Sequence, residues 1–195
     1  MSEVLKKSWS SIVNSSAKNY LRGFSLGSAE SKIVIADILK GMARKDNKLS
    51  IIEFGCGNGQ LFETFVDEKI DCHYTGVDFS EPLLSAARDN FTNFSTSFVM
   101  DDVEKLTKII GKYDVGIYSH VIETLSSPEE SLFNAKKIVN VIIIRFFEPP
   151  NFAFDRVELR EMPISEDSDA TAPYLRRQMS ADYYQRMLFN LECKK

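Results

Sequence analysis

The sequence predicts an α/β fold: a doubly wound, mainly parallel sheet with helices on both faces. Apolar, β-branched runs of strand length alternate along the chain with segments of helical apolar spacing, the pattern of a parallel sheet. These runs are nearly continuously apolar, which is typical of strands buried on both faces. The first run stops at a glycine-rich loop, and in such sheets ligands bind just beyond the strand ends.

Five apolar runs predict the strands of the sheet. They cover residues 49–54, 74–79, 97–100, 113–119 and 140–147. The carboxyl ends of parallel strands meet at one edge of a sheet. Four of the five ends carry carboxylates, namely Glu53, Asp78, the pair Asp101 and Asp102, and Glu148. The sequence therefore predicts an acid-lined ligand site at this edge.

Helical spacing predicts helices over residues 1–20, 29–43, 59–69 and 180–191. Ser80 is expected to cap a helix that starts with Glu81. Ser127-Pro-Glu-Glu130 is typical of a capping box with proline in the first helical position. Residues 103–110 are expected to form a helix or a helical turn. Residues 152–164 alternate as a strand does, and residues 165–173 are expected to form a polar loop.

No repeat, linker or low-complexity tract divides the 195 residues, so a single domain is expected. Residues 1–45 would form an N-terminal helical or lid region and residues 49–147 a ligand-binding core. Residues 148–195 would then form the substrate side. The chain shows no signal-peptide pattern and no apolar run of the roughly 20 residues that span a bilayer. We expect a cytoplasmic protein without a membrane partner.

Composition argues against two classes of site. The net charge of −4 gives no basic footprint for DNA, so no DNA partner is expected. Three cysteines without metal-ligand spacing and only two histidines leave a zinc site short of ligands. We therefore expect no metal.

The loop after the first run reads EFGCGNGQ, residues 53–60. Glycines allow a sharp turn and a close approach of a ligand to the backbone. A dinucleotide fingerprint would require glycine at position 60, where Gln60 stands, and it does not call for the acid Glu53 before the first glycine. The spacing therefore disfavours a nicotinamide-dependent oxidoreductase.

This acid-x-Gly-x-Gly-x-Gly loop resembles motif I of the class I S-adenosylmethionine-dependent methyltransferases. Three later segments resemble further motifs of that family in the expected order. They are YTGVDFSEPLL (74–84), FVMDDVEKL (98–106) and YDVGIYSHVIETL (113–125). The resemblance covers about residues 50–147 and implies S-adenosyl-L-methionine as the cofactor.

The resemblance also implies roles for particular residues. Glu53 would order the loop and reach the methionine amino group, and Asp78 would accept hydrogen bonds from the ribose hydroxyls. Asp102 would face the adenine amino group, with Val103 over the ring. The remaining cofactor contacts would come from Gly55, Cys56, Gly57, Asn58, Gly59, Phe79 and Ser119. An acid-lined pocket also suits the cationic sulfonium and would repel a pyrophosphate.

Residues on the acceptor side are less defined. His120 follows the fourth strand, where the methyl acceptor should lie, and is a candidate contact or general base. Tyr20 and Arg22, in the lid region, and Glu148 are candidate substrate contacts. The arginines at 156, 160, 176 and 177 are expected to be surface charges, with the clasping of an anionic substrate as the alternative.

Several departures from the family pattern restrict the subclass. EPPNF (148–152) follows the fifth strand instead of the fourth, which disfavours the adenine-N6 enzymes. HVIETL (120–125) keeps Glu123 of a metal-dependent RNA-methylating motif but lacks its other ligands. Few residues remain after the last predicted helix, so the family's C-terminal hairpin is expected to be altered or trimmed.

The sequence thus predicts metal-independent methyl transfer, by in-line displacement, to an N- or O-acceptor on a small molecule or terminal group. The enzyme's main contribution would be to hold the acceptor close to the methyl carbon. The alternative is a catalytically inactive, cofactor-binding domain with a regulatory or partner role.

Overall fold

The computed structural model describes residue 11 and residues 30–43, 47–164 and 169–192. Its central feature is a five-stranded sheet in the order β3-β2-β1-β4-β5, in which every neighbouring pair is parallel. The strands are β1 (Leu49–Phe54), β2 (Cys72–Asp78), β3 (Thr96–Met100), β4 (Tyr113–Ser119) and β5 (Val139–Arg145). The predicted doubly wound parallel sheet is confirmed.

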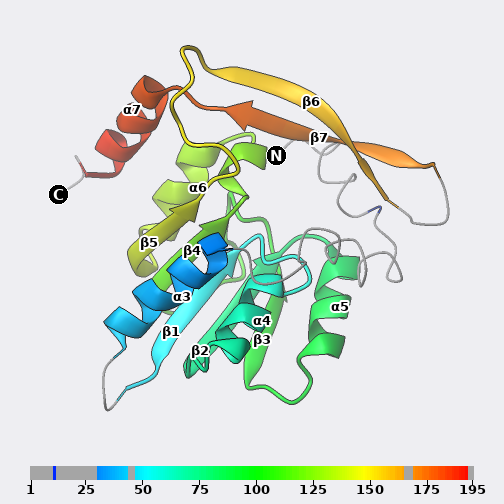
Figure 1. The fold of residues 1–195 in the computed structure, drawn as a ribbon, viewed down its shortest axis with the longest axis vertical. Helices are drawn as coiled ribbons and strands as arrows, with labels where there is room; N and C mark the ends of the chain where they lie inside the picture. The colour runs from blue at the N-terminus through cyan, green and yellow to red at the C-terminus, as the bar shows by residue number, and fades with distance from the viewer. Residues whose placement is uncertain (1–10, 12–29, 44–46, 165–168, 193–195) are drawn as a thin grey trace.

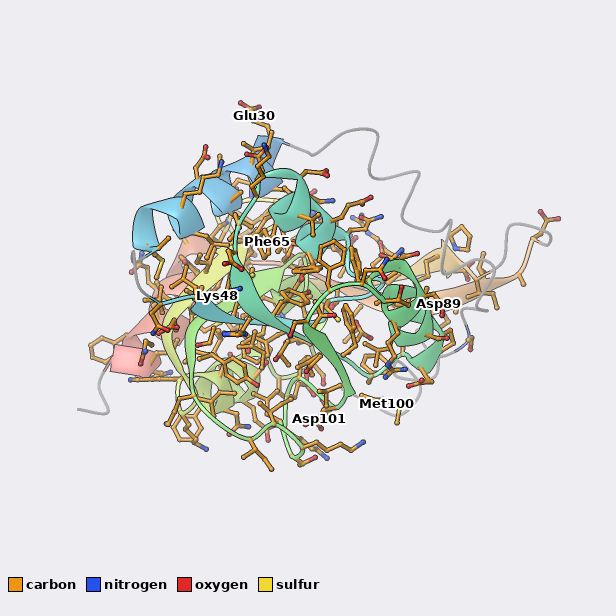
Figure 2. The ribbon with its side chains drawn as sticks, turned by 90° about the horizontal axis from the view of Figure 1, so that it is seen from below. Glu30, Lys48, Phe65, Asp89, Met100 and Asp101 are labelled. Atoms are coloured by element: carbon orange, nitrogen blue, oxygen red, sulfur yellow. The ribbon has the colours of Figure 1, made fainter. Side chains whose placement is uncertain are left out.

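Helices cover both faces of this sheet (Figure 1). They are α3 (Glu30–Met42), α4 (Gln60–Asp67), α5 (Glu81–Asn90), α6 (Pro128–Ala135) and α7 (Ala181–Glu192), with a short 3₁₀ turn, η2 (Ile122–Thr124). Ile51 packs with apolar residues of α3 and α4, whereas its neighbour Ile52 packs with residues of α6 and α7. Successive residues of β1 are therefore buried on opposite faces, which explains why its run is mostly apolar. Figure 2 shows the sheet and its helices from below and labels Phe65 of α4, which packs in the same cluster as Ile51.

The direction of winding reverses at β1. This strand pairs with β2 on one side and with β4 on the other, so the connections that leave β1 and β4 diverge. A crevice opens at such a switch point, beyond the carboxyl ends of the strands. The glycine loop follows β1 and His120 follows β4, so both lie at this point.

The C-terminal strands do not join the sheet. β6 (Arg156–Pro163) and β7 (Thr171–Gln178) form a separate antiparallel ribbon, which runs across the top of the molecule in Figure 1. Met162 of this ribbon packs on Leu83 and Ala86 of α5, and β7 lies against η2, which follows β4. The expected altered hairpin is thus a ribbon that spans the site edge of the sheet.

Helix starts differ from the predictions in their hydrogen bonds. Ser80 and Ser127 occupy the N-cap positions of α5 and α6, but neither side chain makes a capping hydrogen bond. The Ser127 N–H donates instead to Glu104 Oε1 at 2.8 Å, so the expected capping box with Glu130 is wrong. A buried carboxylate from another loop has replaced the local one, and it ties that loop to α6.

Other predicted bounds also shift. Of the two alternatives predicted for residues 103–110, the structure has the helical turn, in which the Lys105 and Leu106 N–H groups donate to the Asp102 carbonyl, and no helix. The fifth strand covers residues 139–145 instead of 140–147, and β7 begins inside the predicted loop 165–173. The helix expected over residues 1–20 lies outside the described residues. Among the helices that the structure describes, none is long and apolar enough to cross a bilayer.

Candidate active site

The glycine loop is anchored on β2. The Gly55 and Cys56 N–H groups both donate to the Val77 carbonyl, at 2.7 and 3.0 Å. Gly55 has a φ of +74° and Gly59 a φ of +84°, in a region of backbone conformation that residues other than glycine rarely adopt. The loop can therefore turn sharply between β1 and α4 only because these positions are glycine.

Asp78 joins this loop to the start of α5. Its carboxylate is buried and accepts hydrogen bonds from the Gly57 N–H through Oδ2 and from the Ser80 N–H through Oδ1, both at 2.9 Å. The expectation that the Ser80 side chain would cap this helix is wrong, because that side chain makes no capping hydrogen bond. Asp78 instead accepts the Ser80 N–H and so holds the turn before α5. Burial raises the pKa of Asp78, and its backbone hydrogen bonds oppose that shift. The two carboxylate oxygens together offer about four lone-pair sites, so Asp78 can accept a further hydrogen bond beyond those from the backbone.

The two acids after β3 have different surroundings. Asp101 is buried, and its two oxygens accept hydrogen bonds from the Asp102 N–H, the Thr107 hydroxyl and the Lys108 N–H. Asp101 therefore holds its own loop together. Asp102 is half-buried and Val103 is buried beside it. The Asp101 N–H donates to the Asp78 carbonyl at 3.0 Å, which brings this loop next to the end of β2.

Glu53, at the end of β1, is a buried acid. The Tyr74 hydroxyl donates a hydrogen bond to its Oε2 atom. Burial raises the pKa of Glu53 to about 8, against the opposing effects of Tyr74 and of the Lys32 charge. Without a ligand, Glu53 is thus largely protonated near neutral pH.

This pKa predicts a measurable pH dependence of stability in the cofactor-free protein. A carboxyl group with a raised folded-state pKa stabilises the fold below its unfolded value of 4.5 and loses that contribution as the pH rises toward about 8. Relative to Glu53→Gln, the wild type should lose about 2 kcal/mol of unfolding free energy between about pH 5.5 and 7. Urea unfolding at both pH values checks this, and parallel losses in the two proteins would contradict it.

His120 stands where β4 ends, with a left-handed φ of +61°. Its ring stacks on Phe147 with 3.8 Å between ring centroids, and its buried Nδ1 has no hydrogen-bond partner among the described residues. Burial lowers the pKa of His120 to about 3, and positive charges act in the same direction. Those charges are, in order of effect, Arg145, Arg176 and Lys32. A histidine with this pKa is a weak base at neutral pH, which disfavours the expected general-base role.

Positive side chains gather on this side of the site. Arg145, the last residue of β5, donates from one terminal nitrogen to the Ser119 hydroxyl at 3.0 Å. Arg176 of β7 is buried, and its guanidinium carbon lies 4.0 Å from the Phe147 ring centroid. The expectation of a surface charge is confirmed for Arg156 and Arg160, whose side chains are 69% and 42% exposed. For Arg176 it is wrong, because the ribbon folds back over the strand ends.

Two glutamates complete the acceptor side. Glu123 of η2 is buried, and its Oε1 accepts hydrogen bonds from the Phe147 and Glu148 N–H groups at 2.6 and 3.4 Å. Burial raises the pKa of Glu123 to about 7. Glu148 is 41% exposed at its side chain and accepts a hydrogen bond from Gln178. Glu123, the one residue kept from the metal-dependent motif, therefore holds the segment after β5 through these two hydrogen bonds.

Most of the predicted site residues meet at the site edge of the sheet. Cys56 and Asn58 are buried in the glycine loop, and Phe79 is half-buried after β2. Tyr20 and Arg22 lie outside the described residues. Sequence reasoning did not single out Lys32, Tyr74 and Arg145, which occupy ordinary helix and strand positions. The one available signal was a charged residue inside or at the end of an apolar run, as at Arg145.

Comparisons with known proteins agree with this geometry. Residues 51–140 match a family model described as a methyltransferase domain. A malonyl-[acyl-carrier protein] O-methyltransferase of Acetivibrio thermocellus is 32% identical over 85 residues, covering 43% of this chain and 30% of that protein. A Bacillus cereus protein of the same name is 28% identical over 100 residues, covering 51% and 37%. The chain thus spans about a third of the length of these relatives.

Solved structures share the fold. An S-adenosylmethionine-dependent methyltransferase from Clostridium acetobutylicum superposes with a TM-score of 0.66 at 13% identity, covering 92% of this chain and 87% of that one. The plantazolicin methyltransferase BamL, in complex with a triazolic desmethylPZN analogue and SAH, gives a TM-score of 0.63 at 15% identity, covering 98% and 73%.

The sheet order and the loops at its carboxyl edge define a Rossmann-like methyltransferase fold. The methyltransferase domain model matches a span that contains the glycine loop and the carboxyl ends of β2, β3 and β4, so this part of the chain resembles the class I S-adenosylmethionine-dependent methyltransferases.

Proposed function

We propose that this protein transfers a methyl group from S-adenosyl-L-methionine to a small molecule or terminal group, without a metal ion. The observation that carries this proposal is the arrangement of Glu53, Asp78 and Asp102 at the ends of three adjacent parallel strands, around one glycine loop. The family match over residues 51–140 supports it.

The chemistry of these residues fits the cofactor. Asp78 would accept hydrogen bonds from the ribose hydroxyls, since its two oxygens together offer about four lone-pair sites, more than its backbone N–H donors occupy. Asp102 would accept from the adenine amino group, with Val103 against the ring. Glu53 would face the methionine ammonium, whose charge favours the ionised form of this buried acid. The loop from Gly55 to Gly59, with Phe79 and Ser119, would supply the other contacts.

When bound, the cofactor would supply an electrophilic methyl group. The chain's own contribution is then to exclude water and to hold the acceptor roughly 3 Å from that carbon. An oxygen acceptor is favoured, because the relatives that match the sequence are named O-methyltransferases acting on a carrier-borne acyl group. Nothing in the fold or the comparisons favours the inactive alternative.

We further propose a cytoplasmic location, from the cysteine pattern, and no DNA partner, from the net charge of −4. His120 and Glu148 remain candidates for acceptor contacts, the first without a base role. Their positions beside Phe147 and β7 support this assignment.

Calorimetry tests the cofactor assignment. We expect S-adenosylmethionine and its demethylated product to bind at micromolar strength, whereas NAD should not bind. Mass spectrometry with a trideuteromethyl-labelled cofactor would then detect transfer. Binding of NAD without binding of S-adenosylmethionine would overturn the proposal.

A further inference from the structure

We propose that the methyl acceptor carries a carboxylate, which Arg145 and Arg176 bind beside His120 at the ends of β4 and β5. This inference rests on the proposed methyltransferase function and names the substrate class of the same site. Its basis is a pair of guanidinium groups that the structure holds at this edge with too few anions around them.

Arg176 is the first of these groups. Its residue is only 7% exposed, although it carries a full positive charge. Within the described part of the chain, its one ion-pair partner is Glu148, at 3.9 Å, and its buried Nε has no acceptor. Desolvation of a charge is costly unless a close counter-charge offsets it. An anionic ligand would supply that counter-charge.

Arg145 carries the second of these guanidinium groups. It donates to the Ser119 hydroxyl, but its buried Nε finds no acceptor among the residues that the structure describes. The same residues place no carboxylate within ion-pair distance of it. The backbone N–H of His120 donates to the Arg145 carbonyl at 2.9 Å, which fixes the end of β5 against the residue that follows β4. Lys32 of α3 contributes a third positive charge that acts on His120.

Nearby glutamates do not neutralise these cations fully. Glu53 accepts a hydrogen bond from Tyr74 and Glu123 accepts two from backbone N–H groups, and within the described part of the chain neither acid forms an ion pair with Arg145 or Arg176. The charges interact at longer range, because Arg145 lowers the pKa of Glu53 and Arg176 lowers that of Glu123. Burial also raises their pKa values, to about 8 for Glu53 and about 7 for Glu123. Near neutral pH Glu123 carries only part of its possible negative charge, and Glu53, once ionised, would be neutralised by the methionine ammonium of the bound cofactor, so the acceptor side keeps an excess of positive charge.

The acceptor's chemistry follows from these charges. A cationic amine would be repelled, and a hydroxyl would need a general base, for which His120 with its pKa of about 3 is too weak. A carboxylate is already ionised at neutral pH and matches the fork of a guanidinium. One carboxylate oxygen forms the new bond to the methyl carbon as the methyl–sulfur bond breaks and its electron pair stays on sulfur. The product is a methyl ester, and no proton needs to move.

A binding experiment tests this without turnover. The protein is first saturated with S-adenosylhomocysteine and then titrated with malonate, glutarate and benzoate. Matched titrations use malonamide, glutaramide, benzamide and inorganic phosphate. We expect at least one carboxylate to bind and its uncharged amide to bind at least tenfold more weakly. Labelled cofactor should then yield a base-labile methyl ester of that carboxylate.

Variants assign the binding to the two arginines. Arg176→Met and Arg145→Met should each weaken carboxylate binding at least tenfold, and Arg176→Met should leave S-adenosylmethionine affinity within twofold. Arg176→Lys keeps the charge but loses the fork, so an intermediate loss is expected. The control is Arg160→Met, which removes an exposed arginine from the other strand of the ribbon and should change neither affinity. Arg176→Lys and Arg145→Met keep the test decisive if Arg176→Met does not fold.

The outcomes separate the two proposals. If S-adenosylmethionine does not bind to the wild type, the proposed function fails. If the cofactor binds but no carboxylate does, or if phosphate binds more tightly, only the carboxylate assignment is overturned. The same holds if the label appears on amines or hydroxyls, or if Arg176→Met and Arg145→Met bind carboxylates as the wild type does.

Discussion

Replacing Asp78 by alanine is expected to raise the dissociation constant for S-adenosylmethionine about a hundredfold, or about 2.8 kcal/mol. Two effects add. Hydrogen bonds to a carboxylate contribute roughly 1.5–3 kcal/mol each, and the ribose diol would lose this acceptor. The Gly57 and Ser80 N–H groups would also lose the oxygens that hold the glycine loop against α5. Calorimetry on the purified variant measures the change.

The control variant changes Asp71, an acid that lies just before the first residue of β2. Asp71 precedes the strand, its side chain is 72% exposed, and it pairs with Lys48 on the surface. Asp71→Ala should bind the cofactor as the wild type does. Asp78→Asn keeps the side-chain volume without the charge, so it should fall between wild type and Asp78→Ala. An unchanged dissociation constant in Asp78→Ala would remove the ribose assignment.

Gly55→Ala is expected to lower the free energy of unfolding by about 3 kcal/mol and to abolish cofactor binding. A side chain at the φ of +74° costs about 1–2 kcal/mol in backbone strain. The added Cβ would also lie 2.5 Å from Val121 Cγ2, well inside van der Waals contact. Overpacking of this kind costs typically about 1–3 kcal/mol. Because Val121 follows His120, the clash would disturb both the glycine loop and the acceptor side.

Two other glycines separate these effects. Gly111 has a φ of +110° with open space around its Cβ position, so Gly111→Ala reports backbone strain alone. Gly41 lies in the last turn of α3 with no contact near its Cβ position, and Gly41→Ala should be neutral or stabilising by up to about 1 kcal/mol. Urea denaturation should therefore rank Gly41→Ala above Gly111→Ala, and Gly111→Ala above Gly55→Ala. If Gly55→Ala were as stable as Gly111→Ala, the Val121 side chain could move aside with no loss of unfolding free energy, which would contradict the expected overpacking.

Local sequence signals were sufficient for the sheet. The bounds of β1 and β4 agree with their apolar runs, because strands buried on both faces need apolar residues at most positions. The spacing of the three glycines before Gln60, together with the acids that end three strands, indicated the cofactor class. These residues lie on strand ends, which a parallel topology brings to one edge whatever the helices do.

The local sequence pattern gave a wrong prediction where a side chain from another segment supplies the hydrogen-bond acceptor. Ser127 followed the capping-box pattern, yet Glu104 supplies the acceptor for its N–H from a loop 23 residues away. The loop that precedes α6 is shaped by this buried carboxylate, which no pattern around residue 127 reveals.

The amino-acid sequence by itself determined the class of fold, the order of its strands along the chain and the acids that follow three of its strands. Only the tertiary structure decided which charges lie at the acceptor side. Arg176 is one of several arginines in a polar, strand-like segment, and its burial depends on the ribbon crossing the strand ends. Arg176 and Arg145, 31 positions earlier, both act on His120 because of long-range packing, since no period or motif connects β5 with β7.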